Sequence, residues 1–151
     1  MGVVISNIKL KNDEYYLVKV KEKNNAVPGQ FYMLRSWDFN PVLSRAISVY
    51  DANSDEVSFL YRVVGEGTSA FTKLKEDDEV TLDGPYGKGF PLVESKKALL
   101  IGGGIGIAPL YMLAKELKKR DCEVDIYFSL RKEEILREEL EEYSDNLVLK
   151  V

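Results

Sequence analysis

The chain has no histidine and a single cysteine, Cys122, among its 151 residues. Without histidine it cannot supply an imidazole base, a Ser-His or Cys-His pair, or a histidine-ligated metal. One cysteine excludes internal disulfides and thiolate-held clusters, and we expect Cys122 to be a small packing residue. Any redox or hydrolytic chemistry therefore needs a bound cofactor or a partner protein.

Long hydrophobic runs and clustered positive charge are also missing. No apolar stretch approaches the roughly 20 residues of a membrane helix, and the N-terminus lacks the basic start and apolar core of a signal peptide. The formal net charge is -4, and no block of Lys and Arg forms a phosphate track. We therefore expect a cytoplasmic globular protein that binds neither a membrane nor a nucleic acid.

The first part of the chain predicts short β-strands, because polar and apolar residues alternate and β-branched residues are frequent. Turn-forming groups such as Pro28-Gly29 separate these segments. Strands of this length and spacing favour a small antiparallel barrel or sandwich. The predicted strands span residues 3–10, 15–20, 31–34, 46–50, 57–64 and 79–82, with one short helix over 69–74.

The pattern changes after Pro91 to that of a parallel α/β unit. Ala98–Ile101 is short and wholly apolar, as in a parallel sheet covered on both faces. Pro109 suits the first turn of a helix. The elements expected after the first strand are a helix from 109 with Leu110, Leu113, Ala114 and Leu117 on its apolar face, a strand over 123–129, a helix over 132–143 with a Glu133–Arg137 pair, and a strand from 147.

We therefore predict a β domain over residues 1–93 and a β-α-β-α-β unit over 94–151. Three parallel strands with two helices make half of a doubly wound fold, so the α/β unit is expected to be incomplete. Its last strand would be an edge, which is a liability unless something covers it. The expectation is a fragment, or a chain that another chain completes.

A glycine cluster lies between the first strand of this unit and its helix: Gly102, Gly103, Gly104 and Gly106 fill four of five positions. Missing β-carbons let a ligand approach the backbone, and a helix N-terminus offers free N–H groups and a positive partial charge to a diphosphate. The alternative is a tight turn, but a turn usually needs one or two glycines. The loop therefore indicates a nucleotide site.

The loop departs from the usual dinucleotide fingerprint. Ile107 stands at the third position, where glycine or alanine is usual. Ser129-Leu130-Arg131 closes the second strand in place of the acidic residue that would hold a ribose hydroxyl. A different nucleotide-binding family is therefore expected. Arg131 would contact a ribose or phosphate, or else be a first-turn surface arginine, and with Lys132 it leaves NAD against NADP open.

Two features of the β domain suggest a second phosphate site. Arg45 interrupts an apolar strand with a permanent charge, and Gly67, Thr68 and Ser69 lie at a strand-to-helix junction, where backbone and hydroxyl donors suit a phosphate. Taken singly, the junction is a turn with a helix cap and Arg45 is a partner for an acid such as Asp83. Together with the glycine loop they indicate two phosphate-bearing ligands, one per domain.

Six motifs in order along the whole chain support one resemblance. They are Pro28-Gly29-Gln30-Phe31, Leu43–Ser48, Leu60-Tyr61-Arg62, Gly65–Thr68, Gly84–Phe90 and Gly102–Pro109. The set resembles the ferredoxin-NADP reductase superfamily and, within it, the dihydroorotate dehydrogenase B electron-transfer subunits. That family implies an antiparallel FAD-binding β-barrel over 1–93 followed by a partial, three-strand parallel α/β NAD-binding domain over 94–151.

The resemblance also implies residue roles. Arg45 would neutralise the FAD diphosphate, Ser48 would bond the flavin ring, and the turn at Gly84–Phe90 would lie near the flavin. No catalytic side chain and no metal ligand are implied. The FAD residues are Arg45, Ala46, Ile47, Ser48, Leu60, Tyr61, Arg62, Gly67, Thr68 and Ser69, and the NAD residues are Gly102, Gly103, Gly104, Gly106, Pro109 and Arg131.

The sequence departs from the family at two points. Ala46 stands where the family usually has proline, which loosens the backbone but spares the side chains implied to contact FAD. The family also continues through a complete nucleotide domain into a four-cysteine segment that binds a [2Fe-2S] cluster, and those cysteines are absent here.

The function implied by the resemblance is an FAD-dependent electron-transfer subunit. It would pass reducing equivalents between NAD(H) and a dihydroorotate dehydrogenase-like catalytic flavoprotein in a hetero-oligomer, in pyrimidine biosynthesis. Cofactor chemistry of this kind needs no acid–base side chain, which fits the lack of histidine. The alternatives are the small subunit of an NADH-dependent ferredoxin:NADP oxidoreductase or sulfide-dehydrogenase-like complex, and a non-catalytic, truncated assembly module.

Overall fold

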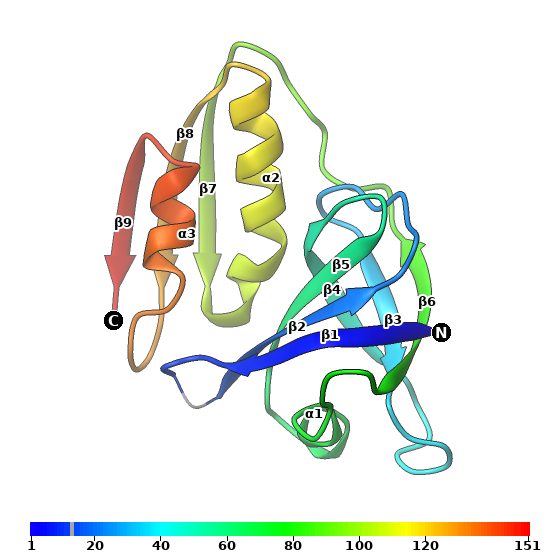
Figure 1. Ribbon diagram of the computed structural model, residues 1–151. Coiled ribbons are helices and arrows are strands. Elements are labelled where there is room, and N and C mark those ends of the chain that lie inside the picture. The colour runs from blue at the N-terminus through cyan, green and yellow to red at the C-terminus, as the bar shows by residue number, and fades with distance from the viewer. Residues whose placement is uncertain (13) are drawn as a thin grey trace.

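The computed structural model describes residues 1–12 and 14–151 as a closed antiparallel β-barrel beside a parallel α/β sheet (Figure 1). The six barrel strands follow the order β1-β2-β5-β4-β3-β6, which confirms the predicted fold class. The strands are β1 (Gly2–Lys9), β2 (Tyr15–Lys21), β3 (Phe31–Arg35), β4 (Arg45–Ala52), β5 (Glu56–Arg62) and β6 (Glu79–Tyr86).

Strand β5 is buried on both of its faces, and this places it between the two halves of the molecule. Phe59 and Tyr61 belong to the core inside the barrel. Leu60 points the other way and packs into the core that the barrel shares with the α/β part. Because side chains alternate along a strand, one run of apolar residues serves both cores.

Helix α1 (Glu66–Phe71) lies against the barrel at the lower end of Figure 1, where Phe71 packs edge-on against Tyr61. The prediction of a helix over 69–74 was wrong in its bounds. The backbone N–H of Gly65 donates to the Thr68 hydroxyl at 3.1 Å, and the Ser69 N–H donates to the Gly65 carbonyl at 2.8 Å. Thr68 therefore caps the helix from inside its first turn, which moves the helix start back to Glu66.

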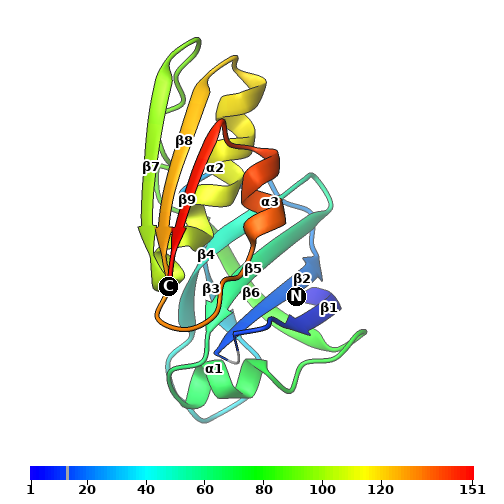
Figure 2. The ribbon, with the colours of Figure 1, turned by 90° about the vertical axis from the view of Figure 1, so that its left-hand side faces the viewer.

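The α/β part contains three parallel strands in the order β7-β8-β9. Figure 2 shows helices α2 and α3 on one face of this sheet. Leu99, Ile101 and Tyr127 are exposed on the sheet strands. The elements are β7 (Lys97–Gly103), the 3-10 helix η1 (Gly104–Ile107), α2 (Ala108–Lys119), β8 (Glu123–Ser129), α3 (Arg137–Glu142) and β9 (Asn146–Lys150).

Helix α3 is shorter than the predicted 132–143 helix. An α-helix of L-residues needs a negative φ at each position, but the segment that carries the buried residues Ile135 and Leu136 is not helical. The backbone instead turns at Leu136, whose φ is 62°, and the helix begins one residue later. The expected Glu133–Arg137 pair was also wrong, because Arg137 pairs with Glu134 at 2.7 Å and with Glu141 at 3.2 Å.

Helix α2 joins the sheet to the barrel through its contact with β4. The Tyr50 and Tyr111 rings stack with centroids 4.4 Å apart and planes 7° from parallel. One helical turn on, Lys115 Nζ donates to both carboxylate oxygens of Asp51 at 2.8 Å. A stacked pair beside a half-buried ion pair resists both sliding and rotation, so α2 fixes the sheet relative to the barrel.

Cys122 is 3% exposed and lies in the core shared by the barrel and the sheet, which confirms it as a packing residue. The predicted boundary at 93/94 falls in the connection between β6 and β7 and stays a prediction. Among the helices of residues 1–12 and 14–151, none is long and apolar enough to cross a membrane.

Tyr111→Ala should lower the free energy of unfolding by about 2–4 kcal/mol, because it removes an aromatic ring packed between the barrel and the sheet. Tyr127→Ala is the matched control, since Tyr127 is 48% exposed on the sheet, and it should cost less than about 1 kcal/mol. Urea denaturation of the two variants measures both values. Equal losses would mean that the Tyr50–Tyr111 stack does not hold the two parts together.

Candidate functional site

Two adjoining cavities lie between the barrel and the carboxyl ends of β7 and β8. The barrel cavity, of about 430 Å³, is lined by Arg45, Ala46, Ile47, Ser48, Leu60, Tyr61, Arg62, Val64, Thr68, Ile105, Gly106, Ala108 and Pro109. The sheet cavity, of about 570 Å³, is lined by Asn12, Glu14, Tyr15, Arg62, Gly103, Gly104, Ile105, Ser129, Leu130, Arg131 and Lys132. Arg62 and Ile105 belong to both linings, so the cavities share a wall.

The barrel cavity gathers most of the residues that the sequence assigns to FAD. Ser48 and Arg45 come from β4, and Leu60 comes from the neighbouring β5. Tyr61 also borders the cavity, but its ring lies in the barrel core, stacked 5.5 Å from the Tyr16 ring. Its hydroxyl donates to Asn7 at 3.2 Å. Burial raises the pKa of Tyr61, so that hydroxyl remains a neutral donor.

Arg45 lies at the rim of the barrel cavity without an ion-pair partner among the described residues. Its guanidinium donates to the Leu43 carbonyl and stands over the Trp37 ring, 5.7 Å from the centroid. A β-carbon on Gly67 would come within 2.5 Å of Arg45 Nε, so glycine makes room for this side chain. The alternative pairing with Asp83 was wrong.

The predicted cluster at the start of α1 is only partly assembled. Gly67 is buried beneath Arg45, and Thr68 lines the barrel cavity while its hydroxyl is engaged in capping α1. Ser69 is exposed and lines neither cavity, and its N–H is used within the helix. Ser69 therefore lies outside both cavities, and its role as a phosphate donor stays a prediction.

The glycine loop divides between the two cavities. Gly103 and Gly104 line the sheet cavity, whereas Gly106 and Pro109 line the barrel cavity. Gly102 lines neither cavity. It packs closely against the residues that follow β7, because a β-carbon on Gly102 would lie 3.1–3.2 Å from Leu110 and Ile107. These residues therefore do not line one common cavity, and their shared role in a nicotinamide nucleotide site stays a prediction.

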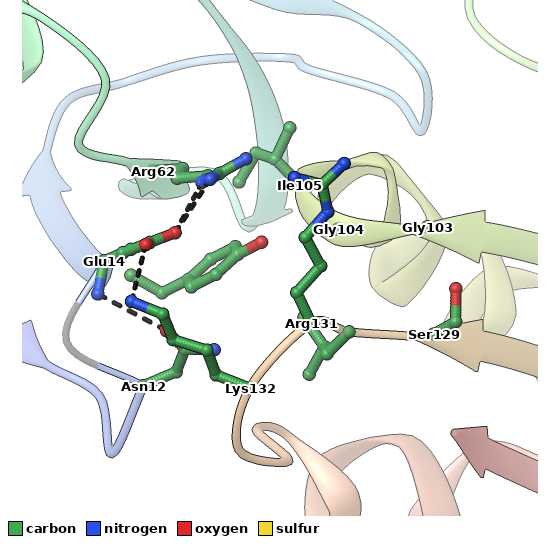
Figure 3. A pocket seen from close by; sticks show the side chains of 11 residues that line it. Asn12, Glu14, Arg62, Gly103, Gly104, Ile105, Ser129, Arg131 and Lys132 are labelled. Atoms are coloured by element: carbon green, nitrogen blue, oxygen red, sulfur yellow. Dashed lines mark hydrogen bonds and ion pairs between the residues drawn. The ribbon is translucent and has the colours of Figure 1, made fainter. Parts of the chain in front are cut away.

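The sheet cavity carries a three-residue ionic cluster (Figure 3). Glu14, in the turn between β1 and β2, binds Arg62 of β5 and Lys132 of the loop after β8, each at 2.8 Å. Hydrogen bonds from Lys132 first, and then from Arg62, lower the pKa of Glu14. Arg131 lines the same cavity and has no hydrogen bond or ion pair among the described residues.

Sequence reasoning missed Asn12, Glu14 and Tyr15 as cavity residues. They lie about 90 residues or more from the glycine loop in the sequence, and no local pattern marks a hairpin turn that touches another domain. Tyr15 carries the clearest structural sign, because a β-carbon on Gly104 would lie 3.4 Å from its hydroxyl. Across the part of the chain that the structure describes, no group of three His, Cys, Asp or Glu residues could hold a metal ion.

Comparison with solved structures identifies the fold of the chain. The chain is similar to the solved NADH-dependent reduced ferredoxin-NADP oxidoreductase, with a TM-score of 0.89, 23% identity, and coverage of 99% of this chain and 56% of that chain. It is also similar to the ferredoxin-NADP+ reductase from Plasmodium falciparum, with a TM-score of 0.80, 18% identity, and coverage of 98% and 68%. The architecture is therefore that of the ferredoxin-NADP reductases.

Comparison of the sequence with curated proteins identifies the family more specifically than the fold does. The chain is 44% identical over 147 residues to the electron-transfer subunit of dihydroorotate dehydrogenase B (NAD(+)) from Clostridium acetobutylicum, and the match covers 97% of this chain and 58% of that one. The chain belongs to the family of these electron-transfer subunits, as its motifs predicted, and spans less than two thirds of that relative's length. No profile of a known protein family matches it.

Gly104→Ala should destabilise the fold by roughly 1–2 kcal/mol, because the φ of Gly104 is 55° and a β-carbon is strained there. Gly106→Ala should change stability by less than about 0.5 kcal/mol, since a β-carbon at Gly106 meets nothing within 4 Å. Thermal or urea unfolding of both variants gives the comparison. A neutral Gly104→Ala would contradict the left-handed backbone at that position.

Proposed function

We propose that the chain holds FAD in the barrel cavity and a nicotinamide nucleotide in the sheet cavity, as the electron-transfer part of a flavoprotein oxidoreductase. The observation that carries this proposal is the wall shared at Arg62 and Ile105. Ligands in adjoining cavities can bring their reactive rings together, whereas ligands in separate cavities cannot. FAD held here would supply the hydride-accepting and electron-transfer chemistry, and the side chains of this chain would bind and orient it.

The barrel cavity suits FAD in its charge and its lining. The Arg45 guanidinium, which has no ion-pair partner among the residues that the structure describes, offers charge-assisted hydrogen bonds to a diphosphate. Ile47, Leu60 and Pro109 provide apolar surface for a flat ring, and Ser48 places a hydroxyl on the same wall. The volume of about 430 Å³ lies within the range of small-molecule sites. In this proposal Arg45 orients the diphosphate and Ser48 orients the flavin ring.

The sheet cavity suits the nicotinamide nucleotide. Open α/β sheets bind nucleotides at the carboxyl ends of their strands, and β7 and β8 end here. Gly103 and Gly104 allow a diphosphate to approach the backbone. Arg62, Arg131 and Lys132 place three cations around the same space. These residues would position the nucleotide against the shared wall, without any proton transfer by a side chain.

We also propose a partner, a catalytic flavoprotein subunit of dihydroorotate dehydrogenase type in a hetero-oligomer of pyrimidine biosynthesis. The support is the 44% identity to a subunit whose name states electron transfer for that enzyme. A [2Fe-2S] cluster does not fit the residues of this chain, because Cys122 is its one cysteine and lies buried. No electron-transfer step within this chain is therefore routed through a cluster.

A second candidate is the small subunit of an NADH-dependent ferredoxin:NADP oxidoreductase-like complex. The TM-score of 0.89 to such an oxidoreductase favours it. The sequence identity to that oxidoreductase is lower, 23% against 44% for the dihydroorotate dehydrogenase subunit, so we favour the first candidate. The subunit that co-purifies with the chain separates the two, since one partner oxidises dihydroorotate and the other reacts with ferredoxin.

The cofactor content of the purified protein tests the flavin part of the proposal. A yellow protein that releases one FAD per chain, identified by mass, is the expected result. A colourless protein that also fails to take up added FAD would remove the proposal and leave a scaffold that serves assembly without carrying electrons.

Arg45→Gln should weaken FAD binding by at least about tenfold, since it removes a charge-assisted contact to the diphosphate. Arg137→Gln is the matched control, because Arg137 is exposed on α3 and pairs with Glu134 and Glu141 outside both cavities. The dissociation constant follows from the quenching of flavin fluorescence on binding. Equal affinities for the two variants would remove Arg45 from the flavin site.

A further inference from the structure

Glu14 holds two cations of the sheet cavity at once. Its Oε1 accepts a hydrogen bond from Lys132 Nζ at 2.8 Å, and its Oε2 accepts from Arg62 Nε at 2.8 Å. The three side chains come from the β1–β2 turn, the end of β5 and the loop after β8, as Figure 3 shows. The carboxylate therefore ties the barrel to the sheet across the mouth of the cavity.

The backbone turn that carries Glu14 is itself anchored. Asn12 is 3% exposed, its Oδ1 accepts the Glu14 N–H at 3.4 Å, and its Nδ2 donates to the Glu133 carbonyl at 3.4 Å. The carboxylate thus sits on a turn that is held against the loop after β8, so its place in the cavity is built into the fold.

The Glu14 carboxylate and a nucleotide phosphate would compete for the same cations in the sheet cavity. Among the described residues, the ionised lining consists of the cations Arg62, Arg131 and Lys132 and the anion Glu14. A nucleotide diphosphate needs the same cations that Glu14 already occupies, and a carboxylate left beside a phosphate repels it. The lowered pKa of Glu14 keeps it ionised at neutral pH.

We propose that Glu14 is a competing anion for the nucleotide site. It neutralises Lys132 and Arg62 while the sheet cavity is free, and the phosphates of an arriving nucleotide displace it from Lys132. Its return to Lys132 then favours release of the spent nucleotide. This role rests on the proposed function, because it concerns the same cavity, and it makes Glu14 a positioning residue that sets nucleotide affinity.

The solvent exposure of Glu14, Arg62 and Lys132 determines how much Glu14 changes the affinity for the nucleotide. The side chains of Glu14, Arg62 and Lys132 are 32%, 36% and 58% exposed. Ion pairs with this much solvent contact are weak enough for a phosphate to displace. Replacing Glu14 by an uncharged isostere should therefore tighten nucleotide binding by roughly three- to tenfold, and added salt should shrink the difference by screening.

The test is calorimetric titration of the FAD-loaded chain with ADP-ribose, which carries the diphosphate without the redox ring. Glu14→Gln should bind it roughly three- to tenfold more tightly than the wild type at low salt. Glu133→Gln is the matched control, since it makes the same charge change at an exposed neighbour of Lys132, and it should stay within about twofold. In a Lys132→Gln background the gain from Glu14→Gln should shrink.

Equal or weaker binding by Glu14→Gln would overturn the proposal while leaving the nucleotide site intact, provided that the wild type binds. If the wild type binds neither ADP-ribose nor NADH, the nucleotide part of the proposed function fails as well. Should Glu14→Gln lose FAD or unfold, Glu14→Asp provides the second variant. It keeps the charge but shortens its reach to Lys132, and binding no tighter than wild type would contradict the competition.

Discussion

The contact between helix α2 and strand β4 is the constraint on which the rest of the structure depends. The stacked Tyr50 and Tyr111 rings and the Lys115–Asp51 ion pair hold the parallel sheet against the barrel in one orientation. That orientation aims the carboxyl ends of β7 and β8 at the barrel, and so it creates both cavities and the wall between them. Neither part alone would form two adjoining cavities of this kind.

The glycine loop contributes backbone to both of the cavities that this packing forms. Because η1 starts directly where β7 ends, the chain passes from the sheet cavity to the barrel cavity within a few residues. Gly103 and Gly104 therefore face one cavity while Gly106 faces the other. Gly102 instead packs against Ile107 and Leu110, so three of the four glycines lie on the cavity walls and the fourth allows close packing of the backbone.

Much of this architecture is predictable from sequence, because alternation, turn residues and the apolar strand at Ala98–Ile101 are local signals. Arg45 and Ser48 were singled out because a charge and a hydroxyl stand out in an apolar strand, and both line the barrel cavity. The start of α3 was not predictable, since it depends on a left-handed turn at Leu136, and leucine carries no local signal for a positive φ. Nor was Glu14, whose partner Lys132 lies 118 residues away in sequence. Contacts between domains depend on how the domains pack, and no short motif encodes that.

We propose that the two cavities bring a flavin and a nicotinamide ring together. Anaerobic addition of NADH to the FAD-loaded chain, followed by visible absorption, tests it most directly. The expected result is loss of the flavin absorption with about one NADH consumed per FAD, because a hydride carries two electrons. A flavin that stays oxidised in the presence of excess NADH and NADPH would contradict the account, even if both nucleotides bind.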